Sequence, residues 1–69
     1  MRASEYRFSR AEWEQLILQW VFKERDRAIL VRRLLDGRTI EQLAEEFDLS
    51  PQRIKKILQD GARSLQGHI

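Results

Sequence analysis

The stretch FDLSPQR at residues 47–53 constrains the fold of this chain more than any other feature of the sequence. It contains Pro51, the only proline, whose ring removes a backbone N–H and disrupts the interior of a helix. The first position of a helix tolerates this loss, and Ser50 is a favourable residue to cap a helix at that point. The stretch therefore predicts that one helix ends near Phe47 and that another begins at Pro51.

The residues before this stretch predict the partner helix. Thr39 and Gln42 have the spacing of a capping box, which indicates a helix over residues 40–47. Asp48 tolerates a positive φ in the turn that follows. Two short helices joined by such a turn form a helix-turn-helix, which we expect at residues 40–59. The apolar residues suit this motif along both helices and the turn: Leu43, Ala44, Phe47, Leu49, Ile54 and Ile57.

The N-terminal half also has a helical pattern. Ser9 and Glu12 form a second capping box, and apolar residues at helical spacing predict a helix over residues 10–22. A further helix is expected over residues 23–36 and is ended by Gly37, which enters the left-handed conformation at no steric cost. Because neither glycine nor proline marks the junction, a single bent helix remains an alternative.

The expected fold class is all-α, a three- to four-helix bundle with a C-terminal helix-turn-helix. A chain of 69 residues forms at most one small domain, and without cysteine it has no disulfide to stabilise it. We expect an N-terminal arm at residues 1–8, one helical domain at residues 9–66 and a tail at residues 67–69. Gly61 lies on the buried side of the last helix, where it either allows a close approach or ends the helix.

Charge is distributed unevenly around Pro51. Residues 39–50 carry a net charge of −4, whereas residues 51–69 carry +3. A recognition helix at residues 51–59 that enters the major groove must tolerate phosphates, which explains this change of sign. Glutamine can pair with adenine, and arginine or lysine with guanine. The candidate DNA-binding residues are Arg38, Thr39, Ser50, Pro51, Gln52, Arg53, Lys55, Lys56 and Gln59.

Residues 24–57, ERDRAILVRRLLDGRTIEQLAEEFDLSPQRIKKI, resemble the fourth conserved region of the major bacterial sigma factors. The shared pattern includes Thr39-Ile40-x-x-Leu43-Ala44-x-x-Phe47 and Ser50-x-x-Arg53-Ile54-x-x-Ile57. The resemblance implies binding to a promoter element upstream of the transcription start, and docking on the flap of the β subunit of RNA polymerase. It places Pro51, Gln52, Lys55 and Lys56 where the family contacts bases, and Ser50 and Arg53 where it contacts the DNA backbone.

The base-contacting positions depart from the family. The family usually has arginine, glutamate, arginine and glutamine where this chain has Pro51, Gln52, Lys55 and Lys56. The resemblance therefore does not extend to the usual promoter sequence. A full sigma factor also needs a further domain to melt DNA, so we expect a stand-alone module such as a small phage or mobile-element regulator.

The sequence analysis thus predicts a cytoplasmic transcription regulator or sigma-like factor that binds double-stranded DNA. Trp13 and Trp20 share one helix face and either pack in the core or form an exposed anchor for RNA polymerase or a second copy. A homodimer would enlarge the DNA footprint. The alternative function is a protein-interaction module that uses the Trp13/Trp20 face and binds little DNA. A second alternative is the DNA-binding part of a recombinase or transposase whose catalytic domain lies on another subunit.

The sequence lacks the residues that several classes of function require. His68 is the only histidine and cysteine is absent, so neither a metal site nor a nucleophile–base pair is expected. We predict no cofactor and no enzymatic activity. No apolar run approaches 18 residues, so no membrane association is expected. Near the N-terminus, Tyr6 and Phe8 are expected to cover the end of the core, and Arg2, Arg7 and Arg10 to form a basic arm or a disordered tail.

Overall fold

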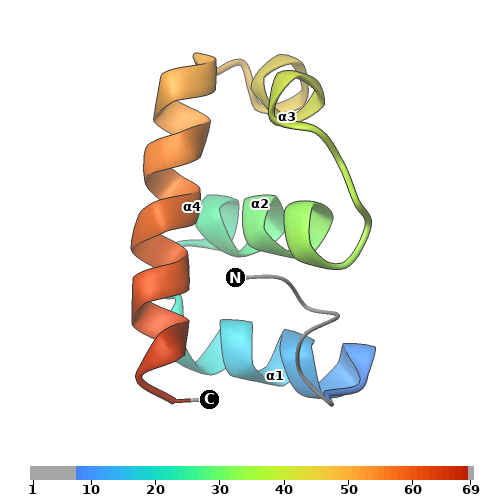
Figure 1. Cartoon of the computed structure of the whole chain (residues 1–69), viewed down its shortest axis with the longest axis vertical. Coiled ribbons are helices and arrows are strands. Elements are labelled where there is room, and N and C mark those ends of the chain that lie inside the picture. The colour runs from blue at the N-terminus through green and yellow to red at the C-terminus, as the bar shows by residue number, and fades with distance from the viewer. Residues whose placement is uncertain (1–7, 69) are drawn as a thin grey trace.

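The computed structural model describes residues 8–68, and it confirms the all-α prediction for them. Its helices are α1 (Arg10–Trp20), α2 (Glu24–Leu34), α3 (Ile40–Phe47) and α4 (Pro51–Gln66) (Figure 1). The predictions for Arg2, Tyr6 and Arg7 lie outside the described residues.

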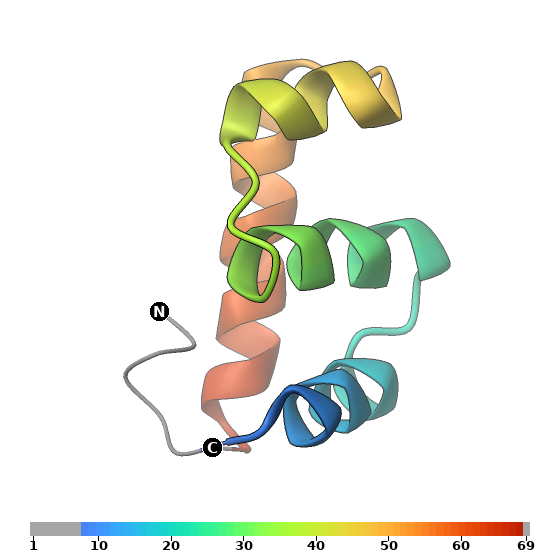
Figure 2. The same cartoon turned by 90° about the vertical axis from the view of Figure 1, so that its right-hand side faces the viewer.

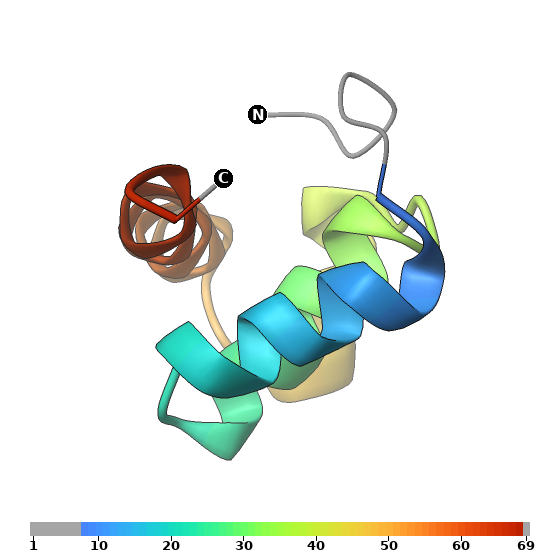
Figure 3. The ribbon, with the colours of Figure 1, turned by 90° about the horizontal axis from the view of Figure 1, so that it is seen from below.

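Helix α4 extends along the whole length of the molecule and packs against each of the other three helices. Figure 2 shows α1, α2 and α3 at three successive levels, with α4 behind them. The helix-turn-helix pair, α3 and the start of α4, forms one end of the molecule, and α1 lies at the opposite end. Seen from below in Figure 3, α1 lies nearest the viewer and crosses α4 rather than running parallel to it.

Three of the four helices begin at caps that the sequence predicts. The Ser9 hydroxyl accepts a hydrogen bond from the Glu12 N–H at 3.2 Å, and the Glu12 carboxylate accepts one from the Ser9 N–H at 3.0 Å. The same reciprocal pair joins Thr39 and Gln42, at 3.1 and 2.9 Å. At the start of α4, the Ser50 hydroxyl accepts from the Arg53 N–H at 3.1 Å. These bonds satisfy backbone donors that have no partner within the helix.

The boundary between α1 and α2 differs from the predictions. Helix α1 ends at Trp20 rather than at residue 22, and Val21 is extended with φ −117° and ψ 113°. The single bent helix is therefore wrong. Arg27 explains the break, because its guanidinium donates to the carbonyl of Leu18 at 2.9 Å and to that of Val21. These donors replace the helical N–H groups that would otherwise satisfy the last carbonyls of α1.

The end of α2 also differs slightly from the prediction. The helix ends at Leu34 rather than at residue 36, and a short turn leads to Gly37. Gly37 has a φ of 70°, the left-handed conformation that the sequence predicts for it.

The hydrophobic core consists of two clusters, one at each end of α4. The first joins α1, α2 and the C-terminal half of α4, and its buried residues are Trp13, Ile17, Val21, Leu30 and Leu65. The second joins α2, α3 and the N-terminal half of α4, and its buried residues are Ile29, Leu43, Ile54 and Ile57. Leu58 packs against both clusters and connects them.

Gly61 lies within α4, which continues to Gln66, so the alternative that it ends the helix is wrong. A Cβ atom at this position would lie 2.5 Å from Cδ1 of Leu30, which is itself buried. The missing side chain therefore lets the Leu30 side chain of α2 approach the backbone of α4.

Candidate nucleic-acid interface

The sharp turn between α3 and α4 is present as predicted. Asp48 has a left-handed backbone, with φ 54° and ψ 47°. The N–H of Leu49 donates to the carbonyl of Ala44 at 3.0 Å and closes the end of α3. Leu49 itself packs against the second core cluster, so the turn is held by an apolar contact as well as by backbone hydrogen bonds.

This turn directs one side of α4 inward and the other outward. Ile54, Ile57, Gly61 and Leu65 are buried on the inner side. All nine candidate DNA-binding residues are exposed: Arg38, Thr39, Ser50, Pro51, Gln52, Arg53, Lys55, Lys56 and Gln59. The last seven lie on the cap and first three turns of α4, whereas Arg38 and Thr39 precede α3 and are contributed by a separate segment.

The hydroxyls of Ser50 and Thr39 are already used as helix caps, but only as acceptors. A serine or threonine hydroxyl also carries one proton that it can donate. Each cap can therefore still donate to a phosphate oxygen. The backbone at Arg38 is held in place, because its carbonyl accepts a hydrogen bond from the Arg33 guanidinium at 2.8 Å.

The arginine and lysine side chains near the start of α4 have no acidic partner within the described part of the chain, unlike several on the other helices. Arg25 pairs with Asp26 at 3.3 Å. Arg32 pairs with Glu46 and lies over the ring of Phe47, and it thus ties α2 to α3. Within residues 8–68, Arg53, Lys55 and Lys56 form no ion pair. Their positive charge is therefore not neutralised by the protein.

Arg10 is not part of a basic arm. It is the first residue of α1 and forms ion pairs with Glu14 at 3.1 Å and with Asp36 at 2.8 Å. The hydrogen bond that Arg10 donates to the Asp36 carboxylate raises the pKa of Arg10. Asp36 is thus paired with Arg10 across the molecule.

Arg63 shares the outward surface but was not among the predicted site residues. Gln52, Lys56, Gln59 and Arg63 follow one another at spacings of four, three and four residues, which places them in one row on a helix. All four are exposed, and the nearest acid on α4 is the exposed Asp60, four residues after Lys56. The prediction ended the recognition helix at residue 59, and the same helical spacing carried one turn further leads to Arg63.

The structure places the two tryptophans differently. Trp13 is only 1% exposed, so the interpretation of Trp13 as an exposed anchor is wrong. It lies in the first core cluster, and Phe8 packs edge-on against it with ring centroids 5.4 Å apart. Trp20 is half-buried, and one face of its ring stacks on His68 at 3.5 Å between centroids. A partner-binding role for Trp20 stays a prediction.

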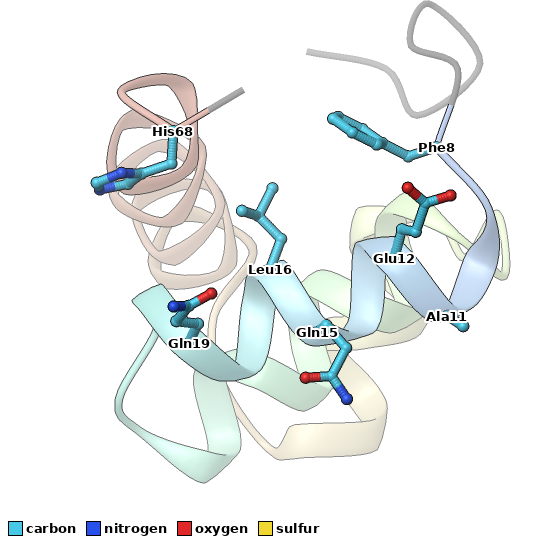
Figure 4. A pocket seen from close by; sticks show the side chains of 7 residues that line it. All are labelled: Phe8, Ala11, Glu12, Gln15, Leu16, Gln19 and His68. Atoms are coloured by element: carbon cyan, nitrogen blue, oxygen red, sulfur yellow. The ribbon is translucent and has the colours of Figure 1, made fainter.

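A separate shallow hollow of about 360 Å³ lies over α1 (Figure 4). Figure 4 shows Phe8 and Glu12 at one side of it, His68 at the other and Leu16 between them. The only carboxylate in its lining, that of Glu12, is occupied by the Ser9 N–H. The hollow therefore offers no pair of groups suited to acid–base or nucleophilic chemistry.

Two other kinds of site were sought in the part of the chain that the structure describes. No group of three or more His, Asp or Glu side chains there could hold a metal ion. None of the helices at residues 8–68 combines the length and the apolar character needed to cross a bilayer.

Comparison with known proteins agrees with this geometry. A family model described as "Sigma-70, region 4" matches residues 21–67. The matched range includes α2, α3 and α4 in full. Neither the curated proteins nor the solved structures contain a match to the chain.

Proposed function

The chain belongs to the sigma-70 region 4 family of DNA-binding helix-turn-helix domains, and we propose that it regulates transcription by placing α4 in the major groove of double-stranded DNA. This family is one of DNA-binding domains rather than of enzymes, and we propose no catalytic activity for the chain. The cytoplasm is where we expect it to meet its DNA.

The observation that carries this proposal is the unneutralised, outward surface of α4. Arg53, Lys55 and Lys56 are exposed and have no acidic partner among the described residues, although the neighbouring α3 is rich in acids. Cations that neutralise phosphates release condensed counterions, which supplies much of the affinity for DNA. The surface is also built on a helix whose other side is packed in the core, so its shape is rigid before DNA arrives.

The exposed residues suggest a division of roles. Gln52, Lys55 and Lys56 project from the first turns of α4 and suit contacts with base edges, glutamine with adenine and lysine with guanine. Gln59 would extend this contact by one turn. Pro51 has no N–H and contributes only apolar surface.

A second group suits the DNA backbone. Ser50 offers a hydroxyl proton at the positive end of the α4 dipole, and Arg53 lies one turn further along the helix. Arg38 and Thr39 would contact flanking phosphates. Because the base-contacting residues are not those usual for the family, we propose a target sequence other than its usual promoter element.

A salt titration of DNA binding tests this proposal. Fluorescence anisotropy with a pool of mixed duplexes would give the slope of log K against log salt for the wild-type chain. The double variant Arg53→Gln/Lys56→Gln should reduce the magnitude of this slope by about 0.9, since one phosphate contact contributes about 0.9 and Arg53 is the residue proposed to contact the backbone. It should also weaken binding further, because the base contact of Lys56 is lost.

The matched control is Arg10→Gln/Arg25→Gln. It removes the same charge from two exposed arginines that are already paired with acids of the protein. Its slope should stay close to that of the wild type. Equal slopes for the two double variants would mean that net charge alone determines DNA affinity, and would contradict the assignment of α4 as the DNA-binding surface. No salt-sensitive binding at micromolar protein would overturn the proposed function.

RNA polymerase is the second partner that family membership supports. Trp13 cannot contribute an exposed anchor because it is buried, which leaves Trp20 as the predicted contact. If polymerase binding is the principal function, the Arg53→Gln/Lys56→Gln variant should still bind purified core enzyme and keep its regulatory effect. Loss of regulation together with loss of DNA binding would favour the DNA-binding function.

A further inference from the structure

The link between α1 and α2 carries an exposed apolar surface, and we propose that it is the centre of a two-fold contact between two copies of this chain. Phe22 is 78% exposed and Leu18 is 52% exposed, and no large apolar side chain among residues 8–68 is more exposed than these two. They are four residues apart, and each leaves most of its surface in water. Contiguous exposed apolar patches rimmed by polar residues are typical of contact sites.

A hollow lies beside Phe22. It has a volume of about 220 Å³ and a largely apolar lining. It is formed by the end of α1, the link, the first turn of α2 and the C-terminal half of α4: Trp20, Val21, Phe22, Lys23, Asp26, Asp60, Gly61 and Ser64. Small-molecule sites begin at about 300 Å³. The hollow is therefore better suited to one protruding side chain than to a bound metabolite.

The arrangement is self-complementary. In a two-fold contact the same surface patch faces itself, so a protruding group and a hollow must lie side by side on that patch. Phe22 and the hollow meet this requirement. The charges do so as well, because Lys23 and Asp60 are exposed, line the same hollow and form no ion pair among the described residues. Lys23 of one copy would face Asp60 of the other.

A patch with both charge signs fits a second copy better than a partner of a single charge sign. Nucleic acid would be repelled by Asp60, and a basic peptide by Lys23. The patch also lies beside the C-terminal half of α4, away from the turn that presents the DNA-binding residues (Figure 1). Gln59 and Arg63 adjoin Asp60 and Ser64 along α4, so the patch borders the far end of the outward row, whereas residues 50–56 lie away from it. Dimerisation does not depend on the proposed function in DNA binding.

We expect the contact to be weak and reversible. A standard interface buries about 800 Å² per partner, a large share of a chain whose total accessible surface is 4921 Å². Phe22 and Leu18 supply only part of such an area. Dimers should therefore form at micromolar rather than nanomolar concentrations of the free chain.

Sedimentation equilibrium of the chain without DNA tests the proposal. Between about 1 µM and about 1 mM, the average mass should rise from 8.3 kDa towards twice that value. Phe22→Ser should stay monomeric over the same range, and circular dichroism would establish that it remains helical.

A charge-reversal pair gives a sharper test. Lys23→Asp alone and Asp60→Lys alone each place two like-charged pairs across the two-fold axis, so each should be monomeric. A mixture of the two variants restores two attractive pairs, one with the native polarity and one reversed, and should dimerise. Both side chains are exposed and aspartate is a good N-cap for α2, so neither change should unfold the chain.

The proposal is overturned if the wild-type mass stays at that of the monomer throughout, if Phe22→Ser dimerises as readily, or if the mixture fails to associate. Purified RNA polymerase core provides a separate comparison. If the wild type is monomeric and binds the core enzyme while Phe22→Ser does not, the patch is a polymerase contact and not a site for a second copy.

Discussion

At the scale of single residues, Asp48 and Gly61 hold positions that few other residues could fill. Asp48 has a positive φ at the end of α3. Left-handed backbone costs roughly 1–2 kcal/mol for residues with a Cβ, although aspartate is among the residues that adopt it most readily. Gly61 lacks the side chain that would collide with Leu30. Each position depends on one local property, and each can be tested by one substitution.

Replacement of Asp48 should depend on the shape of the new side chain. Asp48→Gly should leave the free energy of unfolding within about 1 kcal/mol of the wild type, because relief of the left-handed strain offsets the greater freedom of the unfolded chain. Asp48→Val should lower it by about 2 kcal/mol, since a β-branched residue fits this conformation poorly. Urea denaturation followed by circular dichroism measures both. Equal stabilities of the two variants would contradict the assigned backbone conformation.

Gly61→Ala should destabilise the chain although alanine is the better helix former. The gain in helix propensity is about 1 kcal/mol, whereas overpacking against a buried Leu30 costs about 1–3 kcal/mol, so we expect a net loss of about 1 kcal/mol. Gly67→Ala is the control, because nothing lies within 4 Å of its added Cβ. Thermal unfolding should show a lower midpoint for Gly61→Ala only. In a background with a smaller residue at position 30, Gly61→Ala should cost less than it does in the wild type.

At the scale of helices, the sequence predicts the starts well where local hydrogen bonds set them. The hydroxyl caps at Ser9, Thr39 and Ser50 involve residues only three positions apart, and all three are confirmed. The end of α1 could not be predicted in this way. No glycine or proline marks it, and Arg27 reaches back from the next helix to supply the donors.

The site was predicted from the same local signals, and its omissions have a similar cause. The candidate residues of α4 up to Gln59 could be named because the turn and the proline locate the start of this helix. Arg63 was missed because Gly61 made the end of the helix ambiguous, and only packing against Leu30 resolves that ambiguity. The burial of Trp13 was also ambiguous, because the apolar face of its helix is wide enough for either a core or a contact surface.

Loss of the Arg27 side chain should loosen α1. Hydrogen bonds from a charged donor contribute about 1.5–3 kcal/mol, so Arg27→Ala should lower the free energy of unfolding by about 2 kcal/mol. Arg25→Ala is the matched control, because its pair with Asp26 is exposed and contributes little. Guanidinium denaturation followed by tryptophan fluorescence compares them. If both variants lose the same free energy, the contact of Arg27 with α1 does not hold the helix end.

Arg63 should contribute to DNA binding if the whole outward row of α4 approaches phosphates. Arg63→Gln should then reduce the magnitude of the salt slope by about 0.9, as one phosphate contact does. Arg25→Gln carries the same charge change on α2 and should leave the slope unaltered. An unaltered slope for Arg63→Gln would limit the DNA contact to the first three turns of α4.

At the scale of the whole molecule, two core clusters must behave as one unit for a chain this small to be stable. Leu58 packs against both clusters, and α4 passes through both. The two tryptophans lie at the first cluster only, one within it and one packed against it. Fluorescence therefore reports on the α1 end of the molecule, whereas far-UV circular dichroism reports on all four helices.

Unfolding curves from the two probes should coincide in the wild type, as expected of a two-state transition. Leu58→Ala should lower the free energy of unfolding by about 2 kcal/mol, because it removes packing from both clusters at once. Gln59→Ala, its exposed neighbour, is the control and should change it little. Separate fluorescence and dichroism transitions in the wild type would mean that the clusters unfold independently.

Helix α4 packs against all three other helices and also presents the surface that we expect to contact DNA. The packing residues and the DNA-facing residues lie on opposite sides of this helix. A designer could therefore build a library at positions 52, 55, 56 and 59 and select new target preferences from it. Every variant in the library would keep the hydrophobic core unchanged, because none of these side chains is buried. Randomising positions 54 and 57 instead would yield mostly unfolded chains, whichever residues faced the major groove.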